Sequence, residues 1–107
     1  MKNKLIAAFV FCVACAALHA NETSKRLEAL AQKYEAMANV SRLRAIVIPE
    51  AEYFFTAREL AFREVAATLR VEAALSAGTS TAEPAKKLAE AKTQADAAAV
   101  NLLDAQR

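Results

Sequence analysis

The stretch LSAGTSTAEP, residues 75–84, divides the C-terminal part of the 107-residue sequence into two segments. It contains Gly78, the only glycine of the chain, and Pro84, one of its two prolines. Glycine readily adopts the left-handed conformation that ends helices, and proline is tolerated in the first turn of a new one. Ser80 and Glu83 have the spacing of a capping box. The stretch therefore predicts a tight turn between two antiparallel helices that pack side by side.

The segments on either side of this turn have the composition of helices. Alanine is abundant, tryptophan is absent and glycine occurs once, and alanine is the residue that best tolerates a helix. We expect helices over about 50–77 and 82–106. Apolar residues cover an arc of roughly 200° on the first of these, which is wider than the stripe of an ordinary surface helix. This helix therefore needs neighbours on two sides, from the same chain or from other subunits. The residues expected to pack between helices are Phe54, Phe62, Val65, Leu69, Leu88 and Leu102.

A further helix is expected before this hairpin, over about 23–47. Leu27, Leu30, Tyr34 and Met37 recur along it at three- and four-residue intervals, which predicts its buried stripe. Pro49 ends it, because proline disfavours a helical conformation in the preceding residue; one continuous helix kinked at this proline is the alternative. The predicted fold is all-α, a long coiled-coil-like antiparallel hairpin with an additional N-terminal helix, and the three helices can form a bundle.

The first twenty residues have the three-part pattern of a secretory signal peptide. Lys2 and Lys4 give a positive start, residues 5–18 are apolar, and small residues precede Asn21. We predict cleavage after Ala20, with cleavage after Ala17 as the alternative. The apolar run is shorter than the roughly 20 residues that span a membrane. The mature helical domain is then 21–107, in the periplasm or associated with the outer membrane.

Both cysteines, Cys12 and Cys15, fall within this apolar run. Their C-x-x-C spacing can indicate a redox or metal pair, but polar ligands are absent around them and the segment is predicted to be removed. The alternative is lipidation of Cys15 after cleavage, although bacterial lipoproteins usually have leucine where this chain has Cys12. We expect the mature chain to have no metal site and no small-molecule cofactor.

The charged residues indicate a solvated helical surface. Setting aside Lys2 and Lys4, twelve basic residues balance twelve acidic ones, so nucleic-acid binding is not expected. Glu59 and Arg63 are spaced for an ion pair within one helix. After residue 20 the sequence has no cysteine, histidine or glycine-rich phosphate loop, and no base is present to activate a serine. We therefore expect a protein that is not an enzyme.

One further pattern of the sequence extends over residues 51–54, 57–60, Leu69, 77–80, Ala85, Leu88, Ala91, Ala95 and 101–105. In this pattern the segment from about residue 51 to 106 resembles one half of the periplasmic helical hairpin of TolC-type outer-membrane efflux proteins. In that family a long helix ends in a glycine turn, an alanine- and leucine-rich helix returns, and hairpins from several subunits close into a barrel. The resemblance implies that Gly78, Thr79 and Ser80 form a tip that binds a partner protein.

The expected function follows from this resemblance. The chain would be a non-enzymatic protein of the bacterial envelope that acts in efflux or transport, through helix–helix self-association or by binding other envelope proteins. The alternative is a small stand-alone periplasmic protein with a binding, chaperone-like or inhibitory role, whose apolar arc holds a client.

Overall fold

The computed structural model describes residues 2–107, with side chains from Ala20 onward, and this part of the chain is all-helical. It consists of α1 (Lys2–Val47), a short 3₁₀ turn η1 (Pro49–Ala51), α2 (Glu52–Ala77) and α3 (Ala82–Ala105). The predicted all-α class is confirmed, with no strand in the described part. Residues 1–19 of the predicted signal peptide, Cys12 and Cys15 among them, lie outside the residues whose side chains are described, and the cleavage site stays a prediction.

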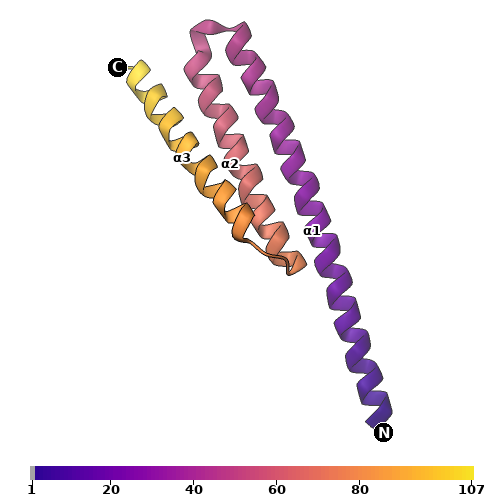
Figure 1. The fold of residues 1–107 in the computed structure, drawn as a ribbon. Helices are drawn as coiled ribbons and strands as arrows, with labels where there is room; N and C mark the ends of the chain where they lie inside the picture. The colour runs from indigo at the N-terminus through magenta and orange to yellow at the C-terminus, as the bar shows by residue number, and fades with distance from the viewer. Residues whose placement is uncertain (1) are drawn as a thin grey trace.

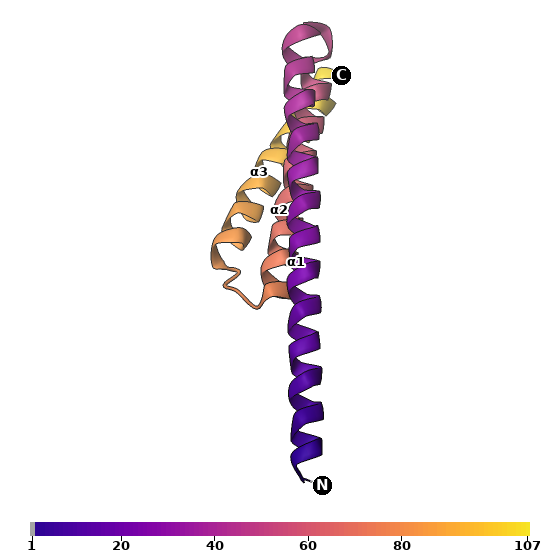
Figure 2. The same ribbon diagram turned by 90° about the vertical axis from the view of Figure 1, so that its right-hand side faces the viewer.

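The three helices run alternately up and down, with α2 in the middle (Figure 1). Helices α1 and α3 both pack against α2, but within the described residues they do not contact one another. Figure 2 shows α3 displaced to one side of the α1–α2 pair. The helices therefore form an open layer, which differs from a bundle in which every helix touches the other two. The reason is that the faces of α2 covered by its neighbours lie roughly 140° apart at 100° per residue.

The contact between α1 and α2 is lined by small residues. Ala31, Ala38 and Ser41 of α1 are buried, whereas Leu30 and Met37 are exposed. The predicted stripe was therefore right at Leu27 and Tyr34, which are half-buried, and wrong by one position at Leu30 and Met37. Small side chains let two helix backbones approach closely, and alanine and serine hold the most buried positions of α1. Apart from Glu28 and Glu35, the buried and half-buried residues of α1 alternate at four- and three-residue intervals, as in a coiled coil. They are Ala20, Ser24, Leu27, Ala31, Tyr34, Ala38, Ser41 and Ala45.

The connection between α1 and α2 is a reversal of the chain at Pro49. Ile48 has an extended backbone (φ −120°, ψ 79°), as expected before proline, and Pro49 begins η1. The Ile48 N–H still donates to the Arg44 carbonyl at 2.9 Å, and the Ala51 N–H donates to the Ile48 carbonyl at 3.0 Å. Figure 1 shows that α2 returns alongside α1 from this point. The alternative of one kinked continuous helix is therefore wrong.

Candidate functional site

The predicted tip lies at the turn between α2 and α3, where a complete helix-ending motif forms. Gly78 has φ 69° and ψ 21°, in the left-handed region. Its N–H donates to the Leu75 carbonyl at 3.2 Å, and the Thr79 N–H donates to the Ala74 carbonyl at 3.0 Å. These two bonds are the pair that defines the Schellman motif, and they satisfy carbonyl groups that the helix end leaves open. The turn is therefore fixed by its own backbone.

The start of α3 differs from the expected capping box. Thr81, rather than Ser80, occupies the N-cap position, and its side chain makes no capping hydrogen bond. The Ser80 hydroxyl instead accepts a hydrogen bond from the Ala82 N–H at 3.3 Å. Thr81 already has a near-helical backbone (φ −95°, ψ 0°), so its side chain is not in the usual capping geometry. Gly78, Thr79 and Ser80 are all exposed, and their binding role stays a prediction.

The residues expected to pack between helices divide into two groups. Phe62 of α2 is half-buried, and its ring centroid lies 6.0 Å from that of Tyr34 on α1. Phe54 and Val65 remain 47% and 39% exposed on α2. Leu69, Leu88 and Leu102 are half-buried.

The buried apolar side chains belong instead to alanines. Among the described residues the buried apolar set is Ala31, Ala38, Ala66, Ala73, Ala74 and Ala98. Alanine buries much less area than leucine, and the hydrophobic free energy follows the buried area. The four- and three-residue recurrence of small residues was the sequence signal for these contacts. The protein thus buries alanines between its helices while many of its larger apolar side chains face solvent.

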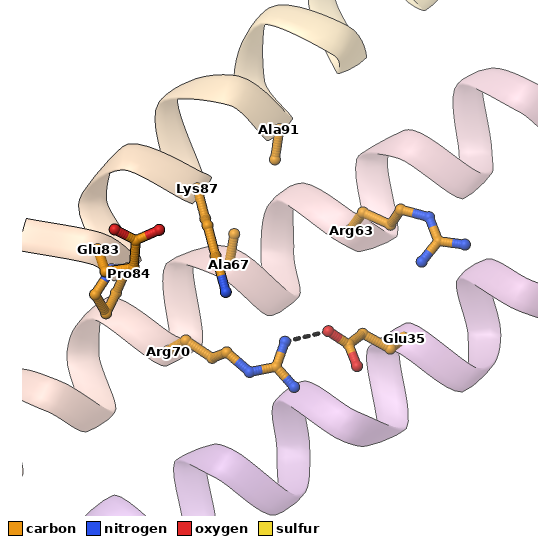
Figure 3. Close-up of a pocket in the computed structure, with 8 residues that line it drawn as sticks. All are labelled: Glu35, Arg63, Ala67, Arg70, Glu83, Pro84, Lys87 and Ala91. Carbon is orange, nitrogen blue, oxygen red and sulfur yellow. Dashed lines mark hydrogen bonds and ion pairs between the residues drawn. The ribbon is translucent and has the colours of Figure 1, made fainter.

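Charged side chains from all three helices line a cleft of about 390 Å³ along one side of α2. Arg70 of α2 bonds Glu35 of α1, and its Nε lies 3.4 Å from the Glu28 carboxylate. Figure 3 shows the Arg70 and Glu35 side chains directed toward each other, with Lys87 extending from α3 toward α2. The residues lining the cleft are Glu35, Arg63, Ala67, Arg70, Glu83, Pro84, Lys87 and Ala91.

A second arginine in this cleft, Arg63, also links α1 and α2. Its Nε lies 2.9 Å from the Glu59 carboxylate one turn earlier, so the ion pair predicted from their spacing is confirmed. Its Nη2 donates to the Asn39 side-chain oxygen of α1 at 3.0 Å. The two arginines therefore fix the register of α1 along α2. The charged groups of α1 and α2 here bind one another, which indicates a structural role for this cleft.

The Arg70–Glu35 pair changes the protonation behaviour of both groups. The hydrogen bond from Arg70 lowers the pKa of Glu35 below its ordinary value, against a smaller opposing effect of burial. The same hydrogen bond raises the pKa of Arg70. A carboxylate with a lowered pKa stabilises the folded chain above its unfolded-state pKa, and this stabilisation is lost as pH falls through the folded-state pKa.

A Glu35→Gln variant should therefore lose less stability than the wild type as the pH is lowered. The side chains of Arg70 and Glu35 are both about one third exposed or more. We therefore expect a difference of roughly 0.2–1 kcal/mol between the free energies of unfolding of the wild type and the variant. It should appear at neutral pH and vanish below the pKa of the folded carboxyl. Urea unfolding at pH 7 and pH 3 measures it. Glu90→Gln, an exposed position on α3, is the control; equal pH dependence in the two variants would contradict a stabilising pair.

Two further findings concern the described residues as a whole. Within this part of the chain, no helix is both long and apolar enough to cross a membrane. No group of three or more histidine, cysteine, aspartate or glutamate side chains with metal-binding geometry occurs there. Comparison with protein-family models, curated proteins and solved structures gave no match to this chain.

Proposed function

We propose that the chain is a non-enzymatic protein of the bacterial envelope that works through helix–helix assembly and partner binding, as the hairpins of outer-membrane efflux channels do. The observation that carries this proposal is the alanine core. Buried apolar positions hold alanine, while Leu30, Met37, Phe54, Val65 and Leu75 face solvent. Apolar surface of this kind marks sites of contact with other proteins. A core this small also gains stability from association.

The exposed turn at Gly78, Thr79 and Ser80 supports the second part of the proposal. It stands at one end of the α2–α3 hairpin (Figure 1), and its backbone is held by the two hydrogen bonds of the Schellman motif. A surface that is already ordered loses little conformational freedom on binding. This turn is therefore suited to recognition of another envelope protein in efflux or transport.

Photo-crosslinking in a Gram-negative host tests this proposal. A photoreactive residue replaces Thr79 at the tip or Thr93 on the outer face of α3; both threonines are exposed. We expect the chain in the periplasmic or outer-membrane fraction, with adducts to envelope transport proteins from position 79 and none from position 93. Retention in the cytosol, or the same adducts from both positions, would refute the proposal.

The alternative function is a stand-alone periplasmic binding or chaperone-like protein. The exposed apolar side chains of α1 and α2 favour it, because a client could cover them. This alternative requires a chain that remains monomeric and binds unfolded or apolar peptides. A stable oligomer that binds no such peptide would exclude it.

A further inference from the structure

Helix α2 carries a third stripe of residues, which α1 and α3 leave exposed. Its members alternate at four- and three-residue intervals, the spacing of a coiled-coil contact. From Phe55 to the end of α2, all residues that do not belong to this stripe are half-buried or buried. The stripe extends for about 32 Å at 1.5 Å per residue. We call these residues the outer stripe: Phe54, Arg58, Ala61, Val65, Thr68, Glu72 and Leu75.

The outer stripe is complementary to itself when two copies run antiparallel. Arg58 lies seven residues before Val65 and Glu72 lies seven residues after it. A two-fold axis at Val65 therefore places Arg58 of each chain opposite Glu72 of the other, because a two-fold contact repeats every pairing twice. The same axis brings Val65 opposite its own copy. It places Phe54 within one residue of the level of Leu75, and Ala61 within one residue of the level of Thr68, an offset of about 1.5 Å along the helix.

A parallel arrangement of the same two stripes would be unfavourable. It would place Arg58 opposite Arg58 and Glu72 opposite Glu72, and like charges across an interface oppose association. Within the described part of the chain, neither Arg58 nor Glu72 forms an ion pair. Both charges are therefore available to a second chain, and their placement selects the antiparallel orientation.

Apolar surface continues from the outer stripe onto both neighbouring helices. On α1, Leu30 and Met37 each lie two residues beyond Glu28 and Glu35, which contact Arg70. Two residues rotate the direction of a side chain by roughly 200°, so these apolar residues flank α2 on the side away from the charged cleft. On the other side, Phe54 and Ala61 border a cleft with Ala99 and Leu102 of α3.

We propose that two copies of this chain pair antiparallel through the outer stripe, with the two-fold axis at Val65. This inference rests on the proposed function in one respect: the self-association proposed there takes place between two copies of this chain. The pairing turns the two tips in opposite directions, which distinguishes it from a barrel whose tips all lie at one end.

Charge reversal tests the pair in the chain as a bacterial host produces and processes it. Sedimentation equilibrium measures the dimer dissociation constant of the wild type, Arg58→Glu, Glu72→Arg and the double variant. We expect a wild-type dimer, a dissociation constant raised roughly tenfold or more by each single reversal, and recovery in the double variant. Glu90→Arg makes the same charge change on the outer face of α3 and should leave the constant unchanged.

Circular dichroism separates these effects from misfolding. Arg58 also stacks on the Phe62 ring at 5.3 Å, so Glu72→Arg, which leaves this contact intact, is the cleaner variant. A monomeric wild type, a hexamer, or a dimer equally stable in all variants would overturn the antiparallel pair. A monomer that still gives adducts from position 79 would leave the proposed function standing. A charge-sensitive dimer retained in the cytosol would support the pair and refute the function.

Discussion

Replacing Ala66 by leucine should lower the free energy of unfolding by about 2–3 kcal/mol, the upper part of the range for overpacking. Ala66 is 1% exposed and lies on α2 between Phe62 and Arg70, which contact Tyr34 and Glu35 of α1. The buried residues of α1 are likewise small: Ala31, Ala38 and Ser41. A leucine side chain would have to push the helices apart. For a domain of this size the loss corresponds to a fall in Tm of about 10–20 °C. Thermal and urea unfolding followed by circular dichroism measure both quantities.

Ala97→Leu is the matched control for this change. Ala97 is exposed on α3, so the same substitution there should change the free energy of unfolding by less than about 0.5 kcal/mol. If Ala66→Leu instead stabilised the chain, the added methyl groups would have found space between the helices. The close approach of α1 and α2 through small residues would then be wrong.

Replacing Gly78 by alanine should lower the free energy of unfolding by about 1–2 kcal/mol, because L-residues with a Cβ atom are strained in the left-handed conformation. A Cβ atom built at Gly78 meets no other atom within 4 Å, so the loss comes from the backbone alone. Gly78→Asn should lose less, since asparagine tolerates this conformation better than alanine does. Urea unfolding of the two variants gives the comparison.

The decisive outcome is which of the two variants, Gly78→Ala or Gly78→Asn, has the larger loss in free energy of unfolding. If alanine and asparagine had equal effects, the strain would not be that of a left-handed residue. If Gly78→Ala left stability unchanged, α2 would continue past residue 78, and the hydrogen bonds to the Ala74 and Leu75 carbonyls would not describe the turn. Circular dichroism would then show additional helix.

Much of the helical architecture could be predicted because its breaks are local. A single glycine at position 78 and a proline at position 49 interrupt a sequence otherwise rich in helix-forming residues, so composition alone gives the all-α class. The position of α1 on α2 could not be predicted in the same way. Leu30 and Met37 are more hydrophobic than Ala31 and Ala38. A prediction based on the spacing of large apolar residues therefore places Leu30 and Met37 in the buried stripe. The most buried residues of α1 are instead the smaller side chains.

The candidate site shows the same division between local and long-range information. The turn at Gly78 and the Glu59–Arg63 pair could be found from spacing along one segment, because both depend on residues a few positions apart. The bonds of Arg70 to Glu28 and Glu35 could not, since they depend on the register between two helices. The outer stripe was also hidden, because it contains Arg58 and Glu72 and does not read as an apolar pattern.

The alanine core has a consequence for how the stability of the chain varies with temperature. The heat capacity of unfolding rises with newly exposed apolar surface and falls with newly exposed polar surface. Long helices in contact through methyl groups release many peptide groups and comparatively little apolar area when they unfold. The heat capacity increment per residue is therefore small for a folded protein, and the stability curve is correspondingly flat. Such a chain changes little in stability between cold and warm conditions.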